Sequence, residues 1–258
     1  MRRGAVAQAD GTTIAYDVTG DGPPVVFLHG LTNRRQAWDP VTALLAPRFT
    51  CVRLDFRGHG ESSTAPAYGM PWFVGDVRAV VEELSLDDPA LVGHSLGGSV
   101  AAVYAALHGA RAVVCVDEPL RFGDTAERIR PLATRLRGER PMEAVMEFER
   151  GLGLEPYAGV AEMERRVLAF DPEVVLAAWA AVLETPPHRL TEVSEALLPQ
   201  ISAPLLCLHG SPPPDDYAAW LTALASGARV EVWDGTGHLL HLVDPARFAA
   251  RAAEFLDR

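Results

Sequence analysis

The sequence has few cysteines, no surplus of positive charge and no long apolar run. Its 258 residues include three cysteines, and the net charge is −11 at pH 7. A chain without a basic surplus cannot neutralise many phosphates, which argues against nucleic acid and anionic membrane as partners. No uninterrupted apolar run approaches the roughly 18 residues that cross a bilayer, and residues 4–10 are too short and polar for a signal peptide. We therefore expect a soluble, cytoplasmic protein.

The three cysteines lie in apolar, strand-like runs. Cys51, Cys115 and Cys207 show neither the spacing of a disulfide framework nor that of a metal site. Because free cysteine behaves as a small apolar residue, this pattern predicts buried thiols in a reducing compartment and no metal ligands.

Short apolar runs alternate with amphipathic helical segments over most of the chain. This rhythm is typical of a doubly wound, mostly parallel α/β sheet with right-handed crossovers. The expected strands are residues 6–9, 12–19, 24–28, 49–55, 89–92, 112–116, 204–208 and 229–233. The expected helices of this part are residues 36–45, 72–84, 99–107, 217–225 and 245–256.

The rhythm changes between residues 120 and 200, which contain helical periodicity and no convincing strand. Prolines punctuate the segment and mark helix boundaries. The expected helices here are residues 126–136, 142–152, 161–170 and 173–183. We therefore predict a core made of residues 1–119 and 201–258, with residues 120–200 inserted as a helical cap, or lid. An insertion after a strand's carboxyl end falls on the face where such sheets bind ligands, so the cap should cover the site.

Gly93-His94-Ser95-Leu96-Gly97 lies between a short β-suited run and an alanine-rich helical stretch. The pattern G-x-S-x-G in that context indicates a nucleophile elbow, a sharp turn that exposes a serine hydroxyl above the sheet. Because the turn is tight, positions two residues on either side of the serine need glycine. Ser95 is therefore the candidate nucleophile.

A serine hydroxyl needs a general base within hydrogen-bonding reach, and histidine suits neutral pH. The best placed of the eight histidines is His238, which follows the last strand and comes after the serine in the chain. His94 and His241 are weaker candidates, because structural or pocket-lining roles are enough to explain them.

The acid that orients the base has two candidate positions. Asp117 ends the strand after the elbow helix, whereas Asp215 and Asp216 follow the next strand. The second region is the commoner place, but the usual Gly-x-x-Asp position there is Pro213. Asp215 also suits a helix N-cap without any catalytic role. We favour Asp117, leave Asp215 and Asp216 open, and keep the neighbouring Glu118 as a further alternative.

Two backbone amides are candidates for an oxyanion hole, the pair of donors that stabilises developing negative charge on a carbonyl oxygen. The N–H of Leu96 lies at the start of the elbow helix, where the helix dipole helps, and the N–H of Leu31 follows His29-Gly30. We expect the loop of residues 57–62 to stabilise the turn beside the site rather than to take part through Arg57 or His59.

Taken together, four motifs resemble a lid-bearing serine hydrolase of the α/β-hydrolase superfamily, similar to esterases and lactonases. The motifs are His29-Gly30-Leu31, Asp55-Phe56-Arg57-Gly58-His59-Gly60-Glu61-Ser62, Gly93-His94-Ser95-Leu96-Gly97-Gly98 and Gly237-His238. The resemblance implies Ser95 as nucleophile and His238 as base. Haloalkane dehalogenases and epoxide hydrolases have an aspartate at the elbow, so the serine argues against them. Some dehalogenases, however, have their acid at the strand end where Asp117 lies.

The leading hypothesis is a hydrolase that cleaves an ester, lactone or thioester of a small substrate through an acyl-enzyme, without cofactor or metal. Specialised chemistry on the same fold, such as C–C hydrolysis or acyl-transfer cyclisation, is one alternative, and a ligand receptor with little turnover is another. The cap supplies apolar side chains for a largely apolar pocket, although these could equally pack the cap helices together. They include Met142, Met146, Phe148, Met163, Phe170 and Trp179. A homodimer is left open.

Overall fold

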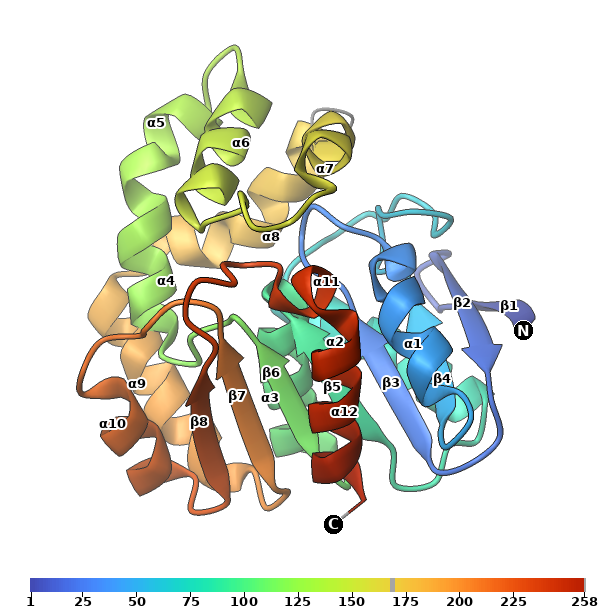
Figure 1. Ribbon diagram of the computed structural model, residues 1–258. Helices are drawn as coiled ribbons and strands as arrows, with labels where there is room; N and C mark the ends of the chain where they lie inside the picture. The colour runs from blue at the N-terminus through green and yellow to red at the C-terminus, as the bar shows by residue number, and fades with distance from the viewer. Residues whose placement is uncertain (168–169, 258) are drawn as a thin grey trace.

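The computed structural model describes residues 1–167 and 170–257. Its centre is an eight-stranded sheet in the order β1-β2-β4-β3-β5-β6-β7-β8 (Figure 1). The β1 and β2 strands pair antiparallel, β2 runs antiparallel to β4, and the other neighbours are parallel. The strands are β1 (Arg2–Ala7), β2 (Thr13–Thr19), β3 (Pro24–Leu28), β4 (Thr50–Leu54), β5 (Ala90–His94), β6 (Val113–Val116), β7 (Leu205–His209) and β8 (Ala228–Val232). The predicted α/β-hydrolase fold class is confirmed.

Helices cover both faces of the sheet, which explains why its central strands are apolar on both sides. One face packs against α2 (Met70–Glu83), α3 (Leu96–His108) and α10 (Tyr217–Leu224). The opposite face packs against α1 (Asp39–Leu45), α11 (Leu240–Val243) and α12 (Pro245–Leu256), and α1 and α12 lie in front of the sheet in Figure 1. All three cysteines are buried and free, as predicted.

Between β6 and β7 the described residues form helices joined by loops, with no strand among them. They are α4 (Phe122–Ile129), η2 (Arg130–Leu132), α5 (Ala133–Leu136), α6 (Pro141–Gly151), α7 (Val160–Val167), α8 (Pro172–Glu184), α9 (Pro187–Leu197) and η3 (Leu198–Gln200). We call this segment, Phe122–Gln200, the helical insertion. Its α5, α6 and α7 lie beyond the carboxyl ends of the strands in Figure 1. The division into core and cap domains stays a prediction.

Several predicted boundaries need correction. The first predicted helix is two elements, η1 (Arg35–Trp38) and α1, because Pro40 occupies the first turn of a new helix. The predicted helix 126–136 is likewise divided, at Pro131. Helix α9 was missed, because Pro187 is at its first position rather than beyond an end. Residues 168–169 of the predicted helix 161–170 lie outside the described residues. No helix among the described residues is both long and apolar enough to cross a membrane.

Candidate active site

Ser95 occupies the sharp turn between β5 and α3. Its backbone angles are φ 51° and ψ −124°, a region that non-glycine residues rarely adopt. A Cβ on Gly93 would lie 2.0 Å from the carbonyl oxygen of Gly97, and a Cβ on Gly97 would lie 2.4 Å from that of Leu28. Strand and helix can therefore approach closely only because both positions are glycine, as the sequence pattern predicts.

Asp117 lies directly after β6 and also has a positive φ, 48°. Its Oδ1 accepts a 2.8 Å hydrogen bond from the amide of Gly210, and its Oδ2 lies 2.7 Å from His238 Nδ1. These two contacts fix the carboxylate against the loops that follow β7 and β8. Of the three aspartates considered from the sequence, Asp117 is therefore the one that contacts the imidazole of His238.

The other two aspartates lie elsewhere. Asp215 and Asp216 are exposed, and Asp216 forms an ion pair of 2.8 Å with Arg121. The N-cap of α10 is Asp216 rather than Asp215, and its side chain makes no capping bond. The expectation that Asp215 caps this helix was therefore wrong by one residue.

The pKa values of the bonded pair move apart. Burial alone would lower the pKa of His238, but the hydrogen bond and charge of Asp117, together with the charges of Glu149 and Glu118, outweigh it, so the pKa is raised. Burial would raise the pKa of Asp117, but the hydrogen bond and charge of His238 hold it below its ordinary value. Asp117 therefore stays ionised and stabilises the protonated imidazole, which is what an orienting acid does for a general base.

Ser95 and His238 lie at the same rim of the sheet. The Ser95 amide donates a 2.9 Å hydrogen bond to the carbonyl of Val116, which immediately precedes Asp117. The neighbouring His94 ring lies 4.5 Å from that of His238, measured between centroids, and its Nε2 is 3.0 Å from the His238 carbonyl oxygen. The described contacts include no direct hydrogen bond between the Ser95 hydroxyl and His238. Such bonds are often long before substrate binds.

The two alternative histidines are buried without an acid partner among the described residues. Burial, and then the charges of His238 and His241, hold the pKa of His94 well below its ordinary value. Burial lowers the pKa of His241 to about 3. Both rings are therefore neutral at pH 7, and the structure gives neither of them the carboxylate contact that His238 has.

The amides of Leu31 and Leu96 lie close to the elbow and have no acceptor among the described residues. A Cβ on Gly30 would lie 3.4 Å from the Ser95 Cβ, so the loop after β3 passes directly beside the serine. The Leu31 carbonyl oxygen is 2.7 Å from His59 Nε2. This contact gives His59 the structural role expected of its loop, since it holds the peptide next to the Leu31 amide.

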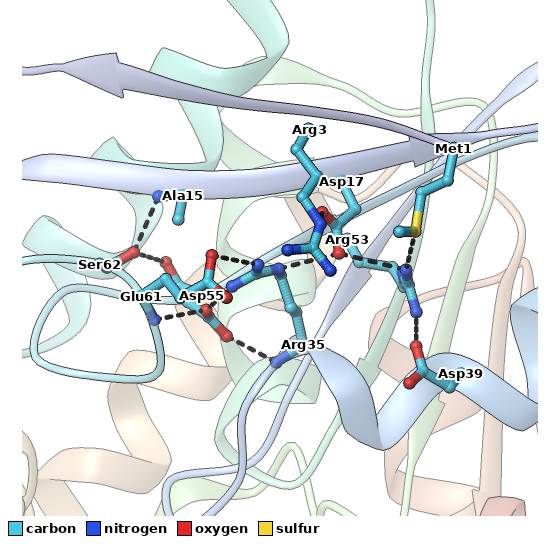
Figure 2. Close-up of polar contacts among 10 residues, drawn as sticks. All are labelled: Met1, Arg3, Ala15, Asp17, Arg35, Asp39, Arg53, Asp55, Glu61 and Ser62. Atoms are coloured by element: carbon cyan, nitrogen blue, oxygen red, sulfur yellow. Dashed lines mark hydrogen bonds and ion pairs between the residues drawn. The ribbon is translucent and has the colours of Figure 1, made fainter.

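A buried ionic network holds Arg35, the residue at which the loop after β3 ends (Figure 2). Arg35 contacts Asp17, Asp55 and Glu61, and all but Glu61 are nearly inaccessible. Asp55 Oδ1 also accepts a 2.7 Å hydrogen bond from the Arg35 backbone amide. Buried charges of this kind need partners at every atom. Nearby, Arg57 is fully buried against Asp76, so it too has a structural role.

Two buried carboxylates lie near the site: Glu118, which the sequence offered only as an alternative to Asp117, and Glu149, which sequence reasoning missed. Glu118 follows Asp117, accepts a 2.6 Å hydrogen bond from the Ser99 hydroxyl, and has its pKa raised by burial to about 7. Glu149, on α6, accepts a 3.1 Å hydrogen bond from the Thr32 hydroxyl. The only feature of the sequence that sets Glu149 apart is its place on the apolar face of a helix. Its contact with Thr32 cannot be predicted from the sequence, because α6 meets Thr32 only in the folded protein.

The apolar residues of the helical insertion reach the candidate oxyanion loop. Leu31 belongs to one apolar cluster with residues of α6 and α8, and Leu96 packs against it. Of the predicted cap residues, this cluster or its periphery contains Met142, Met146, Phe148, Phe170 and Trp179. Met163 instead packs with Leu154 and Leu239 in a separate cluster.

Most of the chain matches one known family. Residues 25–251 match the sequence model of the Alpha/beta hydrolase family, and this range includes Ser95, Asp117 and His238. The chain belongs to the alpha/beta hydrolase family.

Individual curated relatives of this alpha/beta hydrolase match over shorter stretches. A non-heme haloperoxidase of Rhodococcus erythropolis is 39% identical over 107 residues, which are 41% of this chain and 39% of that protein. A serine hydrolase-like protein of Danio rerio is 40% identical over 90 residues, which are 34% of this chain and 28% of that protein. The matched stretch thus spans well under half the length of these relatives.

Solved structures match over nearly the full length. A thermophilic esterase from Thermogutta terrifontis with malate bound has a TM-score of 0.78 at 25% identity, covering 100% of this chain and 98% of that one. The enol-lactonase from Burkholderia xenovorans LB400 has a TM-score of 0.79 at 22% identity, with full coverage of both chains. At the lower identity the likeness shows the shared fold alone.

Proposed function

We propose that this alpha/beta hydrolase is a serine hydrolase that cleaves an ester, lactone or thioester bond through an acyl-enzyme. The observation that carries the proposal is the 2.7 Å contact between Asp117 Oδ2 and His238 Nδ1. It leaves His238 Nε2 as the proton acceptor, at the rim where the strained Ser95 turn presents its hydroxyl. Esterases and a lactonase among the similar structures are consistent with this chemistry.

Each step follows from one of these groups. His238 removes the proton from Ser95 Oγ as the oxygen attacks the carbonyl carbon of the substrate. The amides of Leu31 and Leu96 donate to the negative oxygen that forms. His238 then gives its proton to the departing alcohol, and a water activated by the same imidazole hydrolyses the acyl-enzyme. Asp117 keeps the imidazole in the required tautomer throughout.

The substrate class follows from the groups around the site. The apolar cluster formed by α6, α8 and Leu31 offers a surface for an aliphatic or aromatic acyl group. We propose a small, largely apolar acyl substrate, with the helical insertion as its cover.

Labelling with a fluorophosphonate probe tests the proposal, because the probe forms a covalent bond only with an activated serine. We expect labelling at Ser95 and hydrolysis of p-nitrophenyl butyrate, with Ser95→Ala losing both. Ser211→Ala, which removes an exposed serine, is the matched control and should behave as the wild type. If Ser95→Ala hydrolysed the ester as fast as the wild type, the proposal would be wrong.

A further inference from the structure

Glu149 is a carboxylate buried where the helical insertion meets the core. Its exposed fraction is 6%, although α6 also carries Glu143 and Glu147, whose side chains are 52% and 63% exposed. The one donor to Glu149 among the described residues is the Thr32 hydroxyl, 3.1 Å from Oε1. No described residue donates to Oε2.

The contacts of its neighbours place Glu149 beside the reacting groups. Thr32 follows Leu31, the candidate oxyanion donor, and its hydroxyl bonds directly to Glu149. The turn after α6 touches the base, because the Gly153 carbonyl accepts a 3.0 Å hydrogen bond from the His238 amide. Burial raises the pKa of Glu149, and the charge of His238 and the Thr32 hydrogen bond oppose that shift. Glu149 and His238 are therefore close enough for each to sense the other's charge.

A buried carboxylate with one donor is short of hydrogen bonds. Ionised carboxylates have about four acceptor sites, and leaving them unfilled away from water carries a desolvation cost. The surrounding face of α6 is apolar, with Ala144, Val145 and Met146 all buried. An apolar residue at position 149 would extend that face without the cost. No described residue donates to Oε2, and Oε2 is not one of the fully enclosed atoms without a partner, so solvent or a bound molecule can supply its donor.

We propose that Glu149 is a specificity-determining residue that accepts a hydrogen bond from an N–H or O–H group carried by the substrate near its scissile carbonyl. This inference rests on the proposed function and narrows it: the preferred substrates are acyl esters or lactones with an amide or hydroxyl substituent on an otherwise apolar acyl group. The apolar cluster binds the chain, and Glu149 selects the polar substituent.

Two pairs of chromogenic esters isolate that hydrogen bond. The p-nitrophenyl ester of N-acetylglycine has an N–H where the ester of 4-oxopentanoic acid has a CH₂ group. The ester of 3-hydroxybutyric acid has an O–H that its 3-methoxy counterpart lacks. Values of kcat/KM for each pair are compared after division by the rate of spontaneous hydrolysis. We expect the wild type to favour at least one donor-bearing ester over its partner.

Glu149→Met removes the acceptor at nearly constant volume, and Glu149→Gln replaces the charge with a weaker, neutral acceptor. Because a hydrogen bond to a charged group is worth a factor of roughly 10 to 100, we expect Glu149→Met to lose about 10-fold or more on the favoured donor-bearing ester. Its donor-free partner should lose less than about 3-fold, and Glu149→Gln should fall between. Exposed Glu143→Gln is the matched control and should leave both rates unchanged.

An equal loss on both members of each pair would overturn the inference, since it would mean that Glu149 acts on His238 or on folding alone. The absence of any donor preference in the wild type would overturn it without a variant. Failure of the proposed function looks different, because no ester would then be hydrolysed and Ser95 would not be labelled.

Discussion

The backbone amide of His238 donates a 3.0 Å hydrogen bond to the carbonyl oxygen of Gly153. This hydrogen bond joins the loop that contains His238, the candidate base, to the turn after α6. The contact depends on Gly237, because a Cβ there would lie 1.9 Å from the Gly153 oxygen. The position of the helical insertion and that of the His238 imidazole are therefore coupled through one backbone hydrogen bond.

We expect Gly237→Ala to break the hydrogen bond between His238 and Gly153. The new methyl group would push the turn after α6 away and shift His238, so we expect kcat to fall by 10-fold or more, since displacements of about 1 Å can cost 100-fold. Gly235→Ala is the matched control, because Gly235 has a φ of +79° in the same loop but nothing within 4 Å of a Cβ. It should lose about 1–2 kcal/mol of stability from its backbone conformation alone and keep its kcat. Equal kcat values in the two variants would argue against the coupling.

Asp117→Asn should impair the orientation of His238. An amide can donate to Nδ1 and so favours the wrong tautomer, for which we expect a drop in kcat of roughly 10²–10⁴-fold. Asp216→Asn changes one of the two alternative candidates, Asp215 and Asp216, and should retain full activity. The decisive measurement is kcat on p-nitrophenyl butyrate for both variants. A large loss in Asp216→Asn with little loss in Asp117→Asn would reassign the acid.

The same substitution should shift the pH profile. Asp117 raises the pKa of His238, and activity requires the neutral imidazole, so the acidic limb of kcat/KM reports that raised pKa. Removing the negative charge lowers the pKa of His238. The residual activity of Asp117→Asn should therefore have its acidic limb at lower pH than the wild type. A limb that stays in place or moves upward would mean that another group controls it.

Much of this site was predictable because it depends on local patterns. The glycines on either side of Ser95 indicate the close approach of strand and helix that a nucleophile elbow needs. Asp117 and His238 each follow a strand, and the carboxyl ends of these strands lie at the same edge of the sheet. The departure at Pro213 was informative as well, because it removed the commoner acid position. In each case a requirement of the backbone restricts which residue types can occupy a few adjacent positions, so the sequence alone indicates it.

The missed features depend on contacts between distant segments. Nothing near Glu149 in the sequence indicates that α6 lies over Thr32, 117 residues away in the chain. The partner of Gly237 is likewise invisible until the turn at Gly153 is placed against it. Helix α9 was missed for a different reason, since Pro187 can equally begin a helix or follow one.

Asp55→Asn should loosen the loop that carries Leu31. Asp55 is fully buried and accepts from both the backbone and the side chain of Arg35. An amide there leaves the buried Arg35 to share the buried carboxylate of Asp17 with Arg53. We expect the free energy of unfolding to fall by about 3–5 kcal/mol, the usual cost of breaking a buried ion pair. Asp39→Asn is a control within the network of Figure 2, because Asp39 pairs with Arg53 but is 57% exposed. Its cost should stay below about 1 kcal/mol in urea unfolding. Similar costs for both variants would contradict this account of the loop.

Glu118 should make the stability of the protein depend on pH. Burial raises the pKa of Glu118 in the folded state from 4.5 to about 7, so between these values the folded protein keeps a proton that the unfolded chain releases. Its contribution to stability is therefore largest at low pH and declines as pH rises to about 7, by about 3 kcal/mol at most. Glu118→Gln is neutral throughout and can still accept from Ser99. The free energy of unfolding of this variant, relative to the wild type, should thus increase between pH 5 and pH 8.

The matched variant for that measurement is Glu147→Gln. Glu147 is exposed, and its hydrogen bond and ion pair with Arg135 lower its pKa, so the wild type gains from this group as pH rises. The stability of Glu147→Gln relative to the wild type should therefore change little with pH, and in the opposite direction, because exposed pairs are weakly coupled to folding. Urea unfolding of both variants at pH 5 and pH 8 shows in which direction the stability of each variant, relative to the wild type, changes with pH. A Glu118→Gln difference that stays constant or falls toward pH 8 would show that the carboxyl beside Asp117 is ionised at low pH in the folded protein.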